Sequence, residues 1–532
     1  MNPEFIARAA VLARWINARD NFAVIYNYDA DGISAGAIIC KSLERLGKAF
    51  STKPLKQLYR EEIERLHGEF PDAENFIFVD FGSGQKNELQ EIFAKWAAEG
   101  GNTKEGAGGS GKGSGTKEGG NSQEVDGGKG KESGNKKDDA ESSGKESGNK
   151  GDGDEQKGRK DGSRINAGVA LGYIIIDHHQ PTKEVFGLEL NPLLFGVDGG
   201  NEISAAGTSF LVARELGVDG AGENPGTGVA DGNLGRNSAW ENPAGKNSHE
   251  LRSSNDDLSA LAIVGACGDV QDGSGGLIGA NAEIVKIAER AGVLKKEIDL
   301  RLYGRMTRPL IQFLQFSSSP IIPNLTANEQ NCVKFITGLG IPLKNNERWR
   351  SYDGLLPDEK KALSSALIVH LHSFNVPEWK LKDLIGEVYT LVNERPGTAL
   401  RDAKEYGTLL NACGRHKMAE IGLNVCMGDR GENMLMASSL LLEHRRQLSE
   451  GIRLMQEEGL REFENFYFFD AGERIKDSII GIVAGMLYGS GTISPTKPIV
   501  ALSRVDENFS KASGRATKDL VLKGLNLGKI FK

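Results

Sequence analysis

Acidic and imidazole side chains follow short apolar runs at four places along the chain. These residues are Asp29 and Asp31, then Asp80, then Asp177, His178 and His179, and finally Asp269. Carboxylates combined with one or two imidazoles suit Mn²⁺ or Mg²⁺ better than a metal that prefers thiolates. Two such ions about 3.5–4 Å apart can hold the attacking and the departing oxygen of a phosphoryl transfer. The residue types therefore predict two-metal phosphoester chemistry, with one carboxylate bridging the ions.

Each of these elements has a plainer interpretation when it is taken alone. An Asp that follows a strand is often the N-cap of the next helix, which applies to both Asp29 and Asp80. Adjacent histidines can be surface residues, and the sequence DADG at 29–32 could form a turn or part of a calcium loop. The hypothesis of one shared site depends on the regular order of all four elements.

The apolar runs that precede these residues are typical of strands in a parallel sheet. They start at Phe22, Phe76, Tyr173 and Leu261, and read FAVIYNY, FIFVDFGSG, YIIIDHHQP and LAIVGACGDVQD. Short continuous apolar runs suit strands that are buried on both faces. Helical segments alternate with them, which indicates an α/β sheet covered on both sides. Ligands of such sheets bind beyond the carboxyl ends of the strands, so the four elements are expected to converge.

The pattern changes further along the chain. Helical periodicity dominates from about 300 to 427, for example in DEKKALSSALIVHLHSF and EWKLKDLIGEVYTLVNE. A helix around 434–457 follows, then a strand at FYFFD, a helix at SIIGIVAGML and a strand at KPIVALSRV. We therefore predict an α/β domain with a parallel sheet over 1–300, a helical middle region over 301–427, and a smaller C-terminal α/β domain over 428–532.

Two segments of the first domain differ from the rest in composition. Residues 100–162 are almost entirely Gly, Lys, Glu, Asp, Ser and Asn. This segment has too few apolar residues to offset the entropy that is lost when a chain becomes ordered. Residues 218–254 are rich in Gly and Asn. We expect both to be disordered loop insertions, and we favour a surface loop over a tethered interaction arm for the first.

Overall composition excludes several classes of protein. The 532 residues include 65 Lys and Arg against 73 Asp and Glu, a net charge of -8 that does not favour indiscriminate binding to polyanions but permits a local basic groove. The five cysteines are odd in number and lack a CxxC pair, which argues against a disulfide framework or a structural zinc site. No long apolar stretch and no signal-peptide core are present, so we expect a cytoplasmic protein without membrane spans.

The motifs quoted above resemble those of a known family. NYDADG at 27–32, VDFG at 79–82, IDHH at 176–179 and GD at 268–269 are similar to the four motifs of the DHH phosphoesterase superfamily. The surrounding sequence is most similar to archaeal RecJ-like single-strand exonucleases, including the GINS-associated nuclease. It matches them in NPLLFGVDGGNEISAAGTSFLVARELG, GANAEIVKIAERAG and LRLYGRMTRPL. The segments DAGERIKDSIIGIVAGMLYGSG and FSKASGRAT resemble the DHH-associated domain that holds the nucleic acid.

The resemblance implies a set of metal ligands. Asp29 would bind one Mn²⁺ or Mg²⁺ ion, while Asp31, His178 and Asp269 would bind the other. Asp80 would bridge both ions and share the attacking water.

Further residues acquire roles through the same resemblance. Asp177 would orient the neighbouring imidazoles, and His179 would contact the scissile phosphate. Lys511, Ser513 and Arg515 match the family's Lys-x-Ser-x-Arg pattern, in which an Arg fork, a hydroxyl and an ammonium group grip phosphate. A solvated basic loop is the alternative for these three residues.

The match departs from the family at two points. Many relatives carry His or Asp just upstream of the first carboxylates, where this chain has Asn27, a poorer metal ligand. Relatives also continue into a Gly-Gly-His loop and a final strand, whereas this chain stops at GLNLGKIFK. We therefore expect a weakened first metal site and a truncated C-terminal domain.

Three functions compete. The leading hypothesis is a metal-dependent exonuclease that hydrolyses phosphodiester bonds in single-stranded DNA or RNA, in DNA replication or repair. The second keeps the chemistry but restricts the substrate to short oligonucleotides or cyclic dinucleotides. The third is a non-catalytic scaffold that binds the GINS replication complex, like the RecJ-like subunit of the eukaryotic replicative helicase. Loss of metal ligands would mark a scaffold, and because this chain keeps them, hydrolysis is favoured.

Overall fold

The computed structural model describes residues 1–102, 171–183, 188–217 and 253–531, apart from 274, 318–319, 321, 327, 377–380, 382 and 491–492. The two predicted insertions, 100–162 and 218–254, lie almost entirely outside the described residues. Among the described residues, every helix is too short or too polar to span a lipid bilayer. All five cysteines are buried free thiols.

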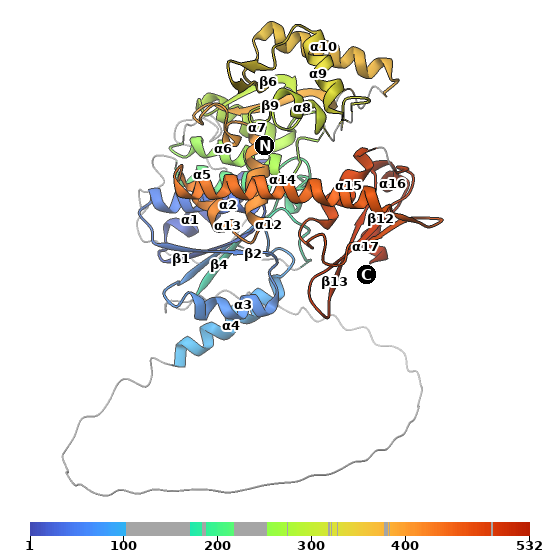
Figure 1. Cartoon of the computed structure of the whole chain (residues 1–532). Coiled ribbons are helices and arrows are strands. Elements are labelled where there is room, and N and C mark those ends of the chain that lie inside the picture. The colour runs from blue at the N-terminus through green and yellow to red at the C-terminus, as the bar shows by residue number, and fades with distance from the viewer. Residues whose placement is uncertain are drawn as a thin grey trace, which may run out of the picture. The chain divides into compact units, whose positions relative to one another are not determined.

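A five-stranded parallel sheet forms the centre of the N-terminal part and confirms the predicted α/β fold (Figure 1). Its strand order is β2-β1-β3-β4-β5, so the chain crosses over between strands that are not consecutive. In sequence order the strands are β1 (Phe22–Asn27), β2 (Phe50–Leu55), β3 (Asn75–Val79), β4 (Gly172–Ile176) and β5 (Glu189–Leu190).

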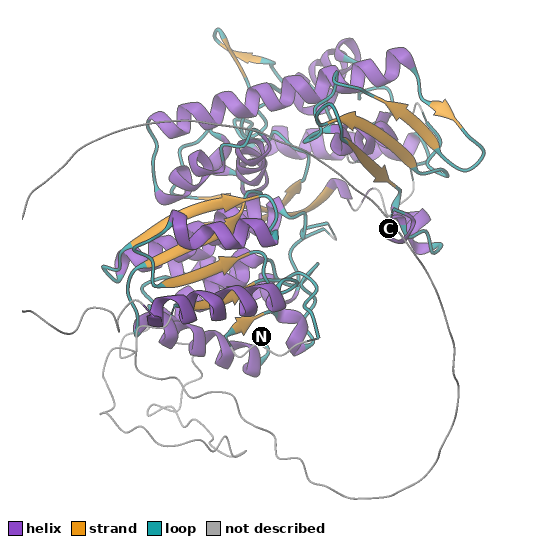
Figure 2. Cartoon of the chain, turned by 90° about the horizontal axis from the view of Figure 1, so that it is seen from below, coloured by secondary structure: helices purple, strands orange, loops and turns teal. Residues whose placement is uncertain are grey.

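Both faces of this sheet are buried, as the continuous apolar runs predict. Val24 and Tyr26 of β1 belong to a large core on one face, while Ala23 and Ile25 belong to a second core on the other face. Figure 2 shows helices on both sides of the strands. The large core draws on α1 (Pro3–Asn17), α2 (Ala30–Arg45), α5 (Ala205–Leu216), α6 (Ser259–Gly268) and α7 (Gly279–Arg290), and the second on α3 (Arg60–Glu69) and α4 (Lys86–Asn102).

The run that starts at Leu261 was expected to be a strand, but it forms helix α6. Six of its residues are buried hydrophobics of the large core, from Leu261 to Cys267 with Gly265 between them. A helix that is apolar all round is stable when neighbouring elements cover every side. Asp269 therefore follows a helix rather than a strand.

An antiparallel two-stranded ladder, β6 (Leu294–Leu300) with β9 (Ile385–Leu391), brackets an inserted segment. The helical prediction for EWKLKDLIGEVYTLVNE is wrong over β9, where β-branched and aromatic residues pair with β6. The segment between the strands has a hydrophobic core of its own. It contains α8 (Leu310–Gln315), α9 (Glu329–Gly338), β7 (Lys344–Asn345), β8 (Arg348–Trp349) and the predicted helix α10 (Pro357–Ser373).

After β9 the chain returns to the large core through α12 (Ala403–Arg415), α13 (Ala419–Met427) and the start of α14 (Glu432–Glu458). The domain boundary expected at 427 does not coincide with a break between hydrophobic cores. The C-terminal elements confirm the expected helix, strand, helix and strand. They form a mixed sheet of β10 (Arg461–Glu462), β11 (Tyr467–Asp470), β12 (Ile499–Arg504) and β13 (Ser510–Arg515), with α15 (Ile480–Ser490), α16 (Lys518–Leu522) and α17 (Leu527–Ile530).

The crossing of α6 and α12 yields a prediction about stability. A Cβ at Gly407 would lie 2.8 Å from Gly268 Cα, whereas one at Gly338, the last residue of α9, would meet nothing within 4 Å. Gly407→Ala should lower the free energy of unfolding by about 1–3 kcal/mol because it overpacks the crossing. Gly338→Ala should leave it unchanged or raise it by up to about 1 kcal/mol. Denaturant titrations of the two variants measure the difference, and equal effects would contradict the close crossing.

Candidate metal centre

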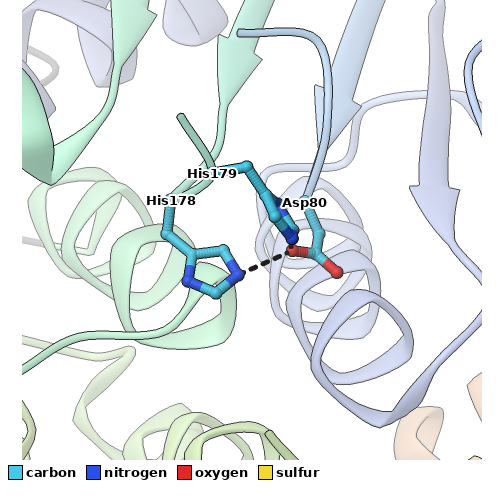
Figure 3. A group of neighbouring side chains, drawn as sticks. All are labelled: Asp80, His178 and His179. Carbon is cyan, nitrogen blue, oxygen red and sulfur yellow. Dashed lines mark ion pairs between the residues drawn. The ribbon is translucent and has the colours of Figure 1, made fainter. Parts of the chain in front are cut away.

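Three of the four predicted elements lie at the carboxyl edge of the parallel sheet. Asp80 directly follows β3, Asp177 directly follows β4, and Asp29 comes two residues after the end of β1. Figure 3 shows the imidazoles of His178 and His179 turned toward Asp80 from the neighbouring strand end. The topology therefore brings together residues that are about a hundred positions apart in the sequence.

Asp80 is the most unusual residue of this edge. Its side chain is 1% exposed, and neither carboxylate oxygen has a hydrogen-bond partner among the described residues. Nε2 of His178 lies 3.1 Å from Oδ1, and Nδ1 of His179 lies 3.6 Å from it. Burial and the negative charge of Asp29 raise the pKa of Asp80 well above its usual range. A buried carboxylate with both oxygens open is a suitable ligand for a cation.

The backbone of Asp80 is also uncommon, because its φ is +66°. Few residues other than glycine adopt this left-handed region, and their presence there often accompanies a functional constraint. The amide of Asp80 still donates a hydrogen bond to the Ile176 carbonyl, at 2.9 Å. The chain therefore turns away from the sheet at Asp80, while the Asp80 amide is still hydrogen-bonded to the last residue of β4.

His178 is fixed by its second ring nitrogen. Nδ1 lies 2.7 Å from the Gly199 carbonyl oxygen and donates to it, which directs Nε2 toward Asp80 and Asp31. Burial opposes a positive charge on this ring, but the close ion pair with Asp80 and the negative charge of Asp31 outweigh it and raise the pKa of His178 to about 11. The imidazole thus carries the positive charge that balances the surrounding carboxylates.

Asp177 holds the loop of the two histidines. Its Oδ1 accepts hydrogen bonds from the amides of His178 and His179, at 2.7 and 3.1 Å, and lies 3.0 Å from His179 Nδ1. Its Oδ2 accepts from the Ser83 amide at 3.0 Å. Burial opposes the charge of Asp177, but the hydrogen bond from His179 and the charges of both histidines lower its pKa to about 2. Asp177 therefore orients His179, whose side chain is 57% exposed.

The carboxylate of Asp31 lies at the N-terminus of α5. Its Oδ2 accepts from the Ala205 amide at 2.7 Å and its Oδ1 from the Ala206 amide at 3.0 Å. Helix N-termini favour negative charge because their first amides have no partner within the helix. These bonds fix Asp31 while Nε2 of His178 lies 3.6 Å from its Oδ2.

Asp269 completes a second group at the C-terminal end of α6. Burial and the charge of Asp31 raise its pKa to about 7. One ligand atom from each of Asp31, His178 and Asp269 lies within 4.8 Å of the others, and the same is true of Asp80, His178 and His179. The structure thus brings together the first of these trios, which the sequence analysis assigned to one ion.

Asp29 belongs to neither trio. It is the N-cap of α2 and accepts a hydrogen bond from the Gly32 amide at 3.0 Å, which is the plainer interpretation of an Asp after a strand. Burial and the charge of Asp31 raise its pKa, so it still lies within the electrostatic field of the centre.

The sequence analysis missed the residues that hold Asp269. Nε2 of Gln271 donates to Asp269 Oδ2 at 3.0 Å and to the Gly199 carbonyl at 2.9 Å. Oε1 of Gln271 accepts from Asn281 Nδ2 at 2.7 Å. One signal was available: Gln271 stands two residues after Asp269, a distance at which loop side chains commonly bond back to a neighbour.

A cavity of about 490 Å³ lies beside the centre. Asp80 and His179 line one part of it, and Lys56 and Tyr59 line another. Asn27 also lines it, and its Oδ1 is buried without a hydrogen-bond partner among the described residues. The open carboxylate of Asp80 is therefore next to a space that can admit a small organic phosphate.

Comparisons with known proteins show two similarities. The family model of the DHH-CID domain matches residues 302–385, which is the segment inserted between β6 and β9. An uncharacterized protein of Methanocaldococcus jannaschii is 26% identical over 524 residues, covering 97% of this chain and 86% of that protein. The inserted segment is thus similar to the DHH-CID domain, in agreement with the resemblance of the sequence motifs to the DHH superfamily.

Two solved structures add to this result. CDC45 from Entamoeba histolytica is 12% identical with a TM-score of 0.52, and the match covers 99% of this chain and 91% of that chain. RecJ from Thermus thermophilus in complex with Mn²⁺ is 15% identical with a TM-score of 0.45. That match covers 97% of this chain but 47% of the Thermus chain, so this protein spans less than half the length of that RecJ. The chain thus shares its overall fold with CDC45.

In the C-terminal part of the chain, β13 carries the predicted phosphate-binding residues. Nζ of Lys511 donates to the Asp477 carbonyl at 2.8 Å, and Nε of Arg515 donates to the Gly481 carbonyl at 2.7 Å. Ser513 lies between them on the strand and is 6% exposed. A Cβ at Gly481 would lie 2.3 Å from the Arg515 guanidinium, so the glycine permits the close approach of this side chain.

Two cations from other parts of the chain approach the same region. Lys56, which lines the cavity, lies 3.7 Å from Asp477 Oδ2, and Arg415 donates to the Ser478 carbonyl at 2.9 Å. Burial, together with the positive charges of Lys56 and Arg415, lowers the pKa of Lys511. A basic region therefore exists locally on a protein whose net charge is -8.

The protonated state of His178 leads to a prediction about metal binding. Nε2 must lose its proton before it can bind a metal ion, so binding should release about one proton at pH 7.5 and strengthen as pH rises. Calorimetric Mn²⁺ titrations in two buffers of different ionisation enthalpy measure this number. His178→Gln should abolish most of the release. Identical heats in the two buffers for the unaltered protein would contradict the prediction.

Proposed function

We propose that this protein hydrolyses phosphodiester bonds in single-stranded DNA or RNA and uses Mn²⁺ or Mg²⁺ to do so. The observation that carries the proposal is the buried Asp80 carboxylate, which accepts no hydrogen bond among the described residues, lies beside two histidines and lines the cavity. The RecJ-like fold supports a phosphoesterase at the level of the family. We place this activity in DNA replication or repair in the cytoplasm.

The side chains of the centre fit divalent ions that prefer oxygen and imidazole ligands. Asp31, His178 and Asp269 would hold one ion. Asp80 would bridge to a second, which Asp29 would bind through the oxygen that the Gly32 amide does not occupy. When bound, such ions increase the acidity of water and neutralise charge on the phosphoryl oxygens.

The protein's own groups would position the substrate. Because Asp177 occupies Nδ1 of His179, the Nε2 atom of this exposed ring is available to a phosphate oxygen. The hydrogen bond to Asp177 raises the pKa of His179, which favours the protonated ring. Nε2–H of this ring would then donate a hydrogen bond to the phosphate oxygen. Asp177 itself is a positioning residue, because it is buried behind the histidines.

The C-terminal region, residues 428–532, would bind the rest of the strand. Lys511, Ser513 and Arg515 line up on β13 near Lys56 and Arg415, and these groups match the charge and hydrogen-bonding needs of consecutive phosphates. Hydrogen bonds to backbone carbonyls already orient Lys511 and Arg515. This arrangement favours a polynucleotide over a dinucleotide substrate.

Asp80→Asn provides the direct test of hydrolysis. It keeps the size of the side chain but removes the charge, so degradation of an end-labelled 30-nucleotide strand with Mn²⁺ should fall by at least about a hundredfold. Asp198→Asn is a matched control, because this exposed acid hydrogen-bonds only within its own loop in the described structure. Intact substrate after incubation with the unaltered protein would refute the proposed function.

The length of the substrate is tested by comparing the 30-nucleotide strand with a dinucleotide and a cyclic dinucleotide. Arg515→Gln should slow hydrolysis of the long strand by about tenfold or more, since a bidentate guanidinium contact to phosphate is lost. The same variant should act on the dinucleotide almost normally. Faster cleavage of the dinucleotide by the unaltered protein would favour the oligonucleotide phosphodiesterase alternative.

A non-catalytic role in a replication complex is the second candidate. The fold shared with CDC45 favours it, and GINS would be the partner. The set of carboxylates and histidines around Asp80 counts against a purely structural role. Recovery of GINS with the tagged protein, combined with no hydrolysis by that protein, would support the scaffold.

A further inference from the structure

The loop that carries Asp269 lies against the β6–β9 ladder. The Glu387 amide donates to the Gly275 carbonyl at 2.8 Å, and the Leu277 amide donates to the Tyr389 hydroxyl at 2.7 Å. A Cβ at Gly386 would lie 2.4 Å from the Gly275 carbonyl oxygen, so the two backbones are in close contact. The DHH-CID segment extends from the same end of this ladder, where Leu300 pairs with Ile385.

Asp272, three residues after Asp269, is the charged anchor of that loop. Its Oδ2 accepts hydrogen bonds from Arg301 Nη2 and from Lys404 Nζ, both at 2.7 Å. Arg301 also donates to the Asp272 carbonyl. The side chains of Asp272 and Arg301 are 5% and 6% exposed, so water does not screen the pair. Hydrogen bonds between ionised partners are among the strong ones in proteins.

Arg301 stands at the base of the DHH-CID segment. The residue before it, Leu300, forms the last pair of the ladder with Ile385, and the Arg301 amide donates to the Leu384 carbonyl at 2.9 Å. The two ends of the segment are thereby joined at the residue whose guanidinium grips Asp272. Lys404 reaches the same carboxylate from α12.

The turn between Asp269 and Asp272 requires support. Val270 has a φ of +60° and its side chain is 68% exposed, a costly conformation for a β-branched residue that makes little packing contact. Such a backbone persists only when neighbouring contacts hold it in place. Gln271 bonds to Asp269 within the turn, and Asp272 connects the turn to residues outside it.

We propose that Asp272, held by Arg301 and Lys404, is a positioning residue that fixes Asp269 in the metal centre and couples it to the base of the DHH-CID segment. The proposal rests on the proposed function in so far as it assigns Asp269 to a metal ion. Asp272 itself contacts no group of the Asp80 cavity.

The main test is the affinity for Mn²⁺, measured by the loss of the free-ion signal in electron paramagnetic resonance titrations. Asp272→Asn and Arg301→Met should each weaken binding about tenfold, the loss typical when the support of a ligand is removed. Lys404→Arg should restore most of what Lys404→Met loses, because it keeps the charge. The full-length protein is used throughout, and thermal unfolding checks that every variant is folded.

Arg305→Met is the matched control. Arg305 is also buried at the base of the segment, with a side chain 5% exposed, but it pairs with Asp299 and Asp402 and not with Asp272. Its loss should disturb the segment and leave Mn²⁺ affinity within about twofold of the original. Equal weakening in Arg301→Met and Arg305→Met, or unchanged affinity in Asp272→Asn, would overturn the proposal.

A second readout does not depend on metal. Amide hydrogen exchange of residues 269–277 should be faster in Arg301→Met than in Arg305→Met, since only the first variant releases the turn. If the unaltered protein bound no Mn²⁺, the proposed function would fail. Faster exchange in Arg301→Met would then still support the part of the proposal in which Asp272 and Arg301 hold the turn. Equal exchange in both variants would overturn that part.

Discussion

The structure depends on the accumulation of negative charge in a space with little water. Asp80, Asp31 and Asp269 surround the single imidazole of His178, and burial raises the free energy of every ionised carboxylate. Leaving a buried acceptor without a hydrogen bond costs about 1–3 kcal/mol. Asp80 leaves two such oxygens open. A folded protein tolerates this arrangement when a cation compensates it, and the protonated His178 supplies one such charge.

The lack of hydrogen-bond donors to Asp80 is not shared by the neighbouring buried carboxylates. Asp31 and Asp177 are equally buried, yet backbone amides satisfy both of them. Beneath the loops, Lys86 and Glu189 form a fully buried ion pair at 2.9 Å, and Ser83 bonds to Glu189 at 2.6 Å. The fold therefore provides hydrogen-bond donors for the carboxylates that orient other side chains. It provides none, among the described residues, for Asp80, which lies beside both imidazole rings and lines the cavity.

Part of this arrangement could be predicted from the sequence, for physical reasons. The strands that end before Asp80 and Asp177 are continuous apolar runs with turn residues behind them, and such runs identify buried parallel strands. The run before Asp269 has the same composition but forms α6, because a short apolar run does not distinguish a strand from a helix covered on all sides. The strand β9 was missed because its alternation is short and follows a helical segment.

Apart from the short separation of Gln271 from Asp269, the sequence carries no signal for the supporting residues. Gln271, Gly199 and Asn281 come from loops and helix ends, and tertiary contacts rather than any periodicity bring them together. The trio of Asp31, His178 and Asp269 was anticipated through the family motifs, since no spacing rule relates three positions so far apart. The motifs assign Asp29 to a metal ion, whereas its position after a strand predicted the cap that it forms on α2.

The position of the DHH-CID segment has a consequence for how this protein can vary. The segment leaves and re-enters at Leu300 and Ile385, which face each other in the ladder. Opposite residues of an antiparallel pair lie about 5 Å apart, a gap that a turn of a few residues can close. Because the segment has its own hydrophobic core, the host domain does not need it to complete its own. We therefore expect the host domain to tolerate segments of different length and sequence at this position, provided that Arg301 is retained.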